Sequence, residues 1–154
     1  MLFLLLHLGS DLYALEAGKI AEVLPLIGIK QIPQAPPGVA GVFNYRGTPV
    51  PAIDLSHLVL GRPAPRRLST RVILAHYPDA AGNERLIGLI AERATETMRR
   101  EPSEFVRAGV DNDATPYLGP VVTDARGLIQ WIDIATLLPA PVRDTLYQQA
   151  AQQG

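Results

Sequence analysis

The chain has 154 residues, of which 47% are hydrophobic and 19% are charged, and its formal net charge is −1. This composition indicates one globular domain, or two small units that share a core, and excludes a disordered chain. The charge balance lacks the basic excess of a nucleic-acid binder, and the absence of cysteine excludes a disulfide framework and a thiolate metal site.

The chain starts with an apolar run, M-L-F-L-L-L-H-L, which has no basic leader and stops at Gly9. The run is too short to cross a bilayer, and no small-residue cleavage site follows it. We interpret residues 2–8 as a strand that is covered on both faces. The turn composition at residues 9–11 joins it to a second strand at 12–15, which predicts a hairpin.

A helical turn is expected at residues 17–19, and an extended segment follows at 20–24. In a regular strand Ile20 and Glu22 point to the same face. An apolar side chain beside an acidic one suits a contact surface for a partner protein. An ordinary half-exposed strand is the alternative interpretation.

The stretch from residue 39 to residue 60 predicts a hairpin followed by a helical turn. Residues 39–45 and 50–55 are rich in strand formers, and Gly47 between them tolerates positive φ. Asp54 stands where an N-cap belongs, ahead of the turn at 55–60. Gly61 and Pro63 end that turn.

Residues 61–70 are the best candidate for a linker between two halves, because they contain two prolines and three arginines. We interpret Arg62, Arg66 and Arg67 as solvated loop charges. A patch for an acidic partner is the alternative.

In the second half, strands are expected at residues 71–77, 86–91 and 117–123, and a terminal helix at about 142–152. Residues 92–100 are polar and fit either an extended edge strand or a short helix. After residue 123 an Arg-Gly pair leads again into Ile132-Asp133-Ile134, as Arg46-Gly47 led into Ile53-Asp54-Leu55. The two aspartates, 79 positions apart, indicate two similar β units with matching structural caps.

Many short strands between Gly and Pro turns favour barrels or a sandwich. A parallel α/β fold is excluded because no long amphipathic helices intervene. No catalytic site is predicted, since Asp54, Ser56 and His57 lie within one helical turn and cannot form a relay. The three histidines are isolated and no phosphate-binding loop exists, so neither a metal site nor a cofactor site is expected.

The blocks N-Y-R-G and V-P-A-I-D-L, preceded by Y-A-L-E, I-A-E-V-L-P and I-P-Q-A-P-P-G-V-A-G-V, resemble the CheW-like coupling proteins of bacterial chemosensory systems. The resemblance covers residues 2 to 138, and its specific part is the stretch from Asn44 to Leu55. It implies a mainly β fold of two five-stranded SH3-like barrels packed on a shared core. The first barrel is expected mainly within residues 12–66 and the second mainly within 67–138, with strand 2–8 assignable to either.

The resemblance also implies a non-enzymatic adaptor, without a cofactor, that couples a chemoreceptor's cytoplasmic tip to the regulatory domain of a CheA-type histidine kinase. Such an adaptor is cytoplasmic, recruited to membrane receptor arrays without inserting into the bilayer, and does not bind nucleic acid. A stand-alone SH3-like peptide-binding module in another pathway is the alternative. The resemblance makes a set of residues candidates for partner contact, namely Ile20, Glu22, Gly41, Asn44, Arg46 and Gly47. For Arg46, a solvated arginine beside a turn remains the competing interpretation.

Overall fold

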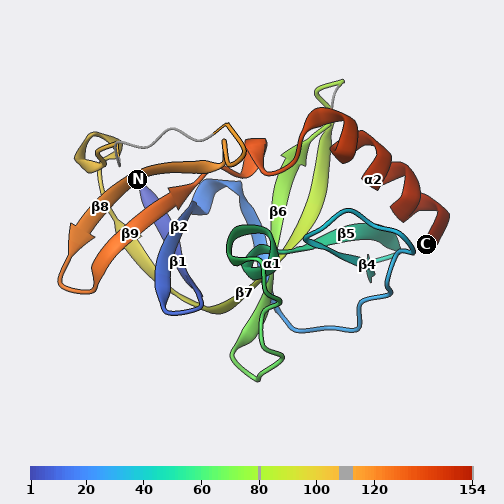
Figure 1. Cartoon of the computed structure of the whole chain (residues 1–154), viewed down its shortest axis with the longest axis horizontal. Helices are drawn as coiled ribbons and strands as arrows, with labels where there is room; N and C mark the ends of the chain where they lie inside the picture. Colours follow the sequence, from blue (N-terminus) through green and yellow to red (C-terminus); the bar gives the residue numbers. More distant parts are fainter. Residues whose placement is uncertain (80, 108–112, 154) are drawn as a thin grey trace.

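The computed structural model describes residues 1–79, 81–107 and 113–153, and its architecture is mainly β (Figure 1). The strands are β1 Leu2–Leu8, β2 Asp11–Glu16, β3 Ile20–Pro25, β4 Val39–Tyr45, β5 Thr48–Asp54, β6 Thr70–Pro78, β7 Glu84–Arg99, β8 Leu118–Asp124 and β9 Gly127–Ile132. Two α-helices, α1 Leu55–Leu60 and α2 Ala140–Gln153, and three short 3-10 turns, η1 Ala17–Lys19, η2 Pro102–Glu104 and η3 Ile134–Thr136, complete the described elements.

The long strand β7 joins two five-stranded units into one sheet. Its first half pairs with β6 and β5, and this unit continues to β3 on one side and β4 on the other. Its second half pairs with β1, and this unit continues through β2 and β9 to β8. We call these the first unit and the second unit. Figure 1 shows β4, β5 and β6 of the first unit on one side and β1, β2, β8 and β9 of the second unit on the other.

The expected pair of five-stranded units is present, but the sheet does not close into complete barrels. In the described residues a single bridge, Lys30 to Val42, spans the open side of the first unit. A second bridge, Val106 to Val121, does the same in the second unit. Val42 of β4 and Val121 of β8 are 79 positions apart, as Asp54 and Asp133 are. The internal repeat therefore includes the bridge that partly closes each unit.

The division of the chain expected near residue 66 needs correction. Strand β6 lies beyond that point yet pairs with β3 of the first unit, while β2 lies before it and pairs with β9 of the second unit. The polar stretch 92–100, left open as strand or helix, forms the second half of β7. Because β7 serves both units, no single position in the chain separates them.

The described residues form three hydrophobic clusters. One lies inside the first unit, around Phe43 and Leu74, and one inside the second unit, around Phe3 and Ile129. The largest cluster contains residues from both units, among them Leu6 and Ile73, and forms the expected shared core. Strand β1 is apolar on both faces because alternate residues enter different clusters.

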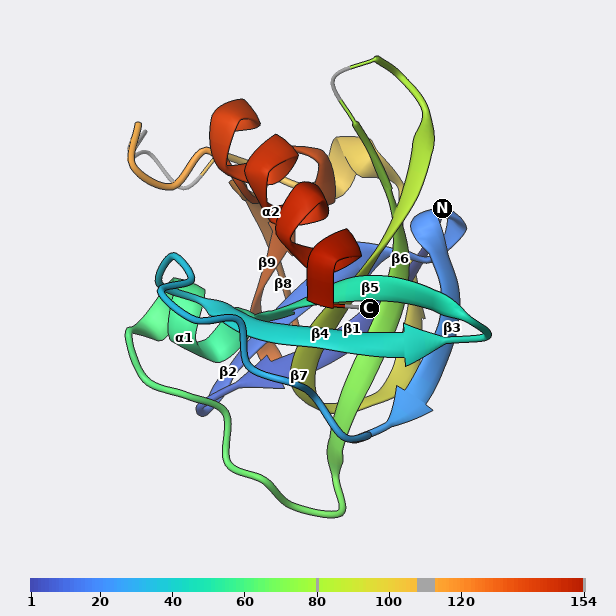
Figure 2. The ribbon, with the colours of Figure 1, turned by 90° about the vertical axis from the view of Figure 1, so that its right-hand side faces the viewer.

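Asp54 caps α1, since its carboxylate accepts hydrogen bonds from the backbone N–H of His57 at 3.2 Å and of Ala64 at 3.0 Å. Asp133 plays the same part at η3, where it accepts one bond from Ala135 N–H at 3.1 Å. The C-terminal helix α2 packs across the first unit beside β4 and β5 (Figure 2). It begins two residues earlier and ends one residue later than the sequence indicates.

Candidate functional site

The tip of the β4–β5 hairpin brings three of the candidate residues together. Arg46 and Gly47 form a two-residue loop in which both have positive φ, 50° and 86°. The side-chain oxygen of Asn44 accepts a hydrogen bond from the backbone N–H of Gly47 at 2.8 Å and so fixes the turn. A left-handed conformation costs an arginine about 1 kcal/mol, and a glycine would avoid this cost. Position 46 therefore carries a side chain although glycine would give a less strained backbone.

Glu22 reaches the same tip from β3. Its carboxylate accepts a hydrogen bond from the Tyr45 hydroxyl at 2.7 Å, and this bond is the main cause that raises the pKa of the Tyr45 phenol. The Arg46 guanidinium lies 5.0 Å from the centre of the Tyr45 ring and 3.9 Å from the Glu22 carboxylate. The Arg46 side chain is 76% exposed. Its planar donors are therefore oriented by Tyr45 and Glu22 but remain accessible to a partner's carboxylate.

Ile20 does not share the face of Glu22, contrary to the expectation from strand alternation. The pairing of β3 with β6 shifts between these residues, so that Ile20 faces Ala75 and Glu22 faces Leu74. Ala75 belongs to the shared core and Leu74 to the interior of the first unit, and Ile20 packs against the shared core. The extra residue of this β-bulge sends the two side chains to opposite faces of the sheet.

Gly41 is set apart from the tip and has a packing reason to be glycine. Its φ is 148°, and a Cβ at this position would overlap the carbonyl oxygen of Lys30. Lys30 and Val42 exchange backbone hydrogen bonds of 2.8 Å there, so the two segments pass very close together. In contrast, a Cβ at Gly47 would meet open space.

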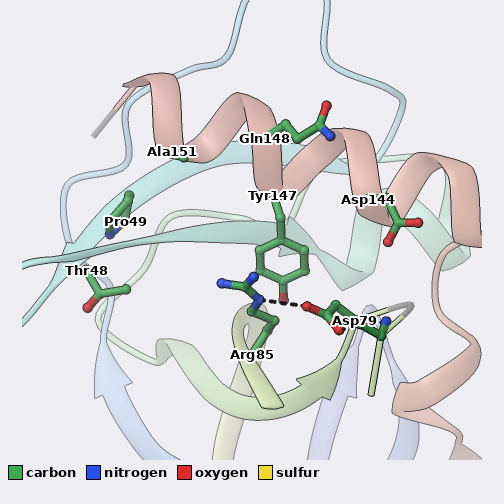
Figure 3. Close-up of a pocket in the computed structure, with 9 residues that line it drawn as sticks. Thr48, Pro49, Asp79, Arg85, Asp144, Tyr147, Gln148 and Ala151 are labelled. Carbon is green, nitrogen blue, oxygen red and sulfur yellow. Dashed lines mark hydrogen bonds and ion pairs between the residues drawn. The ribbon is translucent and has the colours of Figure 1, made fainter. Parts of the chain in front are cut away.

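Next to the hairpin lies an open hollow of about 580 Å³, lined from three sides (Figure 3). Thr48 and Pro49 come from the start of β5, Asp79 and Arg85 from the β6–β7 hairpin, and Tyr147 from α2. The Tyr147 ring points from the helix toward Arg85 and Asp79 in Figure 3. The hollow extends the surface of the tip toward the C-terminal helix.

Polar contacts hold the floor of this hollow in place. Arg85 Nε donates to Asp79 Oδ2 at 3.1 Å, and the Tyr147 hydroxyl donates to the Leu86 carbonyl at 2.8 Å. Burial alone would raise the pKa of the Asp79 carboxyl, but hydrogen bonds from Arg85 and from two backbone N–H groups outweigh it and lower that pKa. Burial also raises the pKa of the Tyr147 phenol. The hollow therefore presents fixed polar groups instead of a reactive one.

The residues that the sequence analysis missed are those whose side chains contact residues on other strands or helices. Tyr45 was visible beside Arg46, and an aromatic residue next to an exposed arginine is a usable signal for a stacked contact. Arg85 and Tyr147 carried no such signal, because they meet only when α2 folds back over the first unit.

Within the described ranges, no group of three His, Asp or Glu side chains is arranged to hold a metal ion. None of the helices in those ranges has the length and apolarity that a membrane crossing requires.

Comparison with known proteins gives a family for the chain. The model of the CheW-like domain matches residues 2–142. A chemotaxis protein CheW from Helicobacter pylori is 32% identical over 99 residues, which span 64% of this chain and only 56% of that protein's length. A chemotaxis protein CheW from Klebsiella aerogenes is 24% identical over 139 residues, 88% of this chain and 80% of that protein.

A solved structure shares the fold. The scaffolding protein TtCheW from Thermoanaerobacter tengcongensis superposes with a TM-score of 0.78 over 90% of this chain and 87% of its own, at 21% sequence identity. This likeness agrees with the two-unit β architecture and the C-terminal helix.

Proposed function

The chain belongs to the CheW-like family, whose members are non-enzymatic scaffold proteins of chemotaxis, and we propose that it couples a chemoreceptor to a CheA-type histidine kinase. The match of the family model to residues 2–142 is the observation that carries this proposal. In such an adaptor the signal depends on the geometry of assembly. The named partners, the cytoplasmic tip of the receptor and the regulatory domain of the kinase, are part of the proposal.

The receptor would contact the β4–β5 tip. The exposed Arg46 guanidinium, oriented by Tyr45 and Glu22, can bind a carboxylate on a receptor helix through two parallel hydrogen bonds. The left-handed backbone at Arg46 supports this role, since a residue other than glycine held at positive φ often marks a functional position. Glu22 and Asn44 would set the orientation of the arginine and of the turn. Ile20, which packs against the shared core, would contribute through the position of β3.

The kinase would contact the second unit, where the sheet ends at β8. Leu128 at the start of β9 and Val106, which bridges to β8, are large apolar side chains that remain exposed. Exposed apolar groups on or beside the last strand of a sheet favour docking of another β domain. The two partners would then occupy different units, which an adaptor that holds both at once requires. This work would take place in the cytoplasm, at membrane receptor arrays.

Reconstitution from purified parts tests the proposal. The chain is mixed with a soluble fragment of a receptor cytoplasmic tip and with the kinase regulatory domain, and complexes are resolved by size-exclusion chromatography. We expect binary complexes with each partner and a ternary complex with both. If the chain fails to bind the receptor tip, or fails to bind the kinase regulatory domain, the adaptor function is refuted. Binding to a short proline-rich peptide in their place would support the alternative, a peptide-binding module.

A further inference from the structure

The loop that joins α1 to β6 gathers unpaired positive charge. Arg62, Arg66 and Arg67 lie on this loop, and Arg93 of β7 joins them because its backbone N–H donates to the Ser69 carbonyl at 2.9 Å. Across residues 1–79, 81–107 and 113–153, none of these four guanidinium groups forms an ion pair with an acidic side chain. Arg62 and Arg67 line one hollow, and like charges repel one another, so their proximity costs free energy until an anion neutralises them.

The backbone of this loop is firmly held. Asp54 accepts a bond from Ala64 N–H, and the Ser56 hydroxyl donates to the Arg62 carbonyl at 2.8 Å. The Thr70 hydroxyl accepts from Arg67 N–H at 3.1 Å and donates to the Pro65 carbonyl. The backbone of the loop is therefore defined, which lowers the backbone entropy that a partner's binding must overcome.

Leu68 stands at the end of this loop with 97% of its surface exposed. Its carbonyl accepts a bond from the Arg71 guanidinium, so the turn that displays it is fixed. In Figure 2 the loop descends from α1 to the lowest part of the molecule before it rises into β6, far from α2. An exposed apolar side chain gains free energy only when a partner covers it.

A hollow of about 380 Å³ opens beneath the loop, and Arg62, Arg67, Ser10 and Glu92 are among the residues that line it. Glu92 is only 7% exposed, and its Oε1 has no hydrogen-bond partner among the described residues. A buried carboxylate oxygen without a donor is costly. The hollow thus combines two arginines that have no acidic partner among the described residues with a glutamate of which one oxygen, Oε1, lacks a donor there.

We propose that these groups form a docking surface for an acidic segment of a partner protein. We call it the arginine loop surface and define it by Arg62, Arg66, Arg67, Leu68, Glu92 and Arg93. The segment would supply carboxylates for the arginines, an apolar contact for Leu68 and one donor, a Lys or Arg side chain, for Glu92. The surface is separate from the β4–β5 tip and the β8 edge, so it does not depend on the adaptor function proposed above.

The mixed charges favour a protein segment over an anionic lipid surface. The four cations of the arginine loop surface are all arginines, whose planar donors match carboxylates bidentately. One exposed leucine buries little apolar area in a bilayer, where firm attachment needs a whole amphipathic face or an acyl chain. A peptide, unlike a phosphate layer, also places a cation at a fixed spacing from its acids, as Glu92 requires.

An array of synthetic peptides tests the surface directly. The peptides vary the number of Glu residues, the presence of a Leu and the presence of a central Lys, and the best binder is then titrated by fluorescence anisotropy. We expect retention to rise with Glu content and to need both the Leu and the Lys. Raising the salt from about 0.05 M to about 0.3 M should weaken binding several-fold, because exposed charges are screened.

Variants of the chain decide whether this surface is responsible. The double variant Arg66→Glu/Arg67→Glu should bind the selected peptide at least about tenfold more weakly. Arg99→Glu, an exposed arginine further along β7, should bind like wild type, and it is compared with Arg66→Glu alone, which makes the same change in charge. Glu92→Gln should lose the preference for a central Lys. Melting curves confirm that each variant is folded.

Any one of four results would overturn the proposal. Retention that does not depend on Glu content would refute acidic recognition, and equal losses for Arg66→Glu and Arg99→Glu would refute the location. Tighter binding to phosphatidylglycerol vesicles than to every peptide, lost in the double variant, would assign the loop to a membrane surface instead. If the double variant changed only self-association, measured by sedimentation, the occupant would be a second copy of the chain.

Discussion

The two units of the sheet carry the same pair of charges at the same place and use it differently. In the first unit Arg46, at the β4–β5 turn, lies 3.9 Å from Glu22 of β3. In the second unit Arg126, at the β8–β9 turn, lies 3.4 Å from Glu96 in the second half of β7. Each glutamate is on the neighbouring edge of its own unit, so the repeat in the sequence reproduces an interaction across strands.

The surroundings of the two arginines decide what each can do. Arg126 also forms a 2.6 Å ion pair with Asp124, which a second arginine, Arg100, contacts at 3.5 Å. The Arg126 side chain is 38% exposed, which is half the exposed fraction of the Arg46 side chain. Arg126 is therefore neutralised within the fold, whereas Arg46 has one carboxylate at 3.9 Å and keeps free donors. Of Arg46 and Arg126, therefore, only Arg46 is available to a partner.

The frame beneath these side chains is the same in both units. The backbone N–H of Asp54 donates to Gly38, and that of Asp133 donates to Tyr117, each at 2.8 Å. Both aspartates then cap a helical turn. The two units thus differ in the side chains at their turns and share the hydrogen bonds that shape each unit.

The largest effect on stability is expected where the first unit departs from the second. Gly41 passes against Lys30, and Pro120 stands 79 positions later in β8. Gly41→Ala should cost about 3 kcal/mol or more, because the added methyl group overlaps a backbone carbonyl and φ is unfavourable. Gly47→Ala, with open space around it, should cost only about 1 kcal/mol.

Denaturant unfolding of both glycine variants measures this difference. Equal losses of stability would show that the close approach at Gly41 does not exist. A stable Gly41→Ala variant that fails to bind a receptor tip would assign this glycine to partner contact instead.

The two caps should differ by about a factor of two. Asp54 holds two backbone N–H groups and is almost fully buried, so Asp54→Ala should cost about 2 kcal/mol. Asp133 holds one, so Asp133→Ala should cost about 1 kcal/mol. Thermal unfolding of the two variants side by side provides the check, and a larger loss at Asp133 would contradict the assigned hydrogen bonds.

The smallest effect concerns acid. Hydrogen bonds from Arg126 lower the pKa of Asp124 to about 2. Because the pKa of this carboxyl is lower in the folded chain than in the unfolded one, its contribution is complete above about pH 4 and is lost as the pH falls through about 2. After allowance for solvent screening the contribution is about 1 kcal/mol.

Stability measured against pH for wild type and Arg126→Ala would show this contribution. The two curves should differ by a constant amount above about pH 4 and converge near pH 2. A difference that stays constant down to pH 2 would mean that Asp124 is not the partner of Arg126.

Much of the fold follows from local patterns in the sequence. The hairpin around Gly47, the cap at Asp54 and the strand 2–8 covered on both faces all depend on residues close together in the chain, and the structure has each of them. The repeat of Arg-Gly and Ile-Asp predicted two similar units for the same reason.

The rest depended on contacts between distant segments. A polar stretch such as residues 92–100 does not reveal that it continues β7, because its pairing with β1 compensates for its weak strand pattern. The bulge that separates Ile20 from Glu22 is likewise set by the register against β6. The bond between Tyr45 and Glu22 joins residues 23 apart and has no local signature.

One paired titration tests the central claim that the two arginines have different roles. Arg46→Glu and Arg126→Glu make the same change in charge, and each variant is titrated calorimetrically against a receptor cytoplasmic tip, with melting curves alongside. We predict that Arg46→Glu weakens receptor binding at least about tenfold with little change in melting temperature. Arg126→Glu should lower the melting temperature by several degrees and leave receptor affinity unchanged. Wild-type affinity for Arg46→Glu, or unfolding of that variant, would contradict the account.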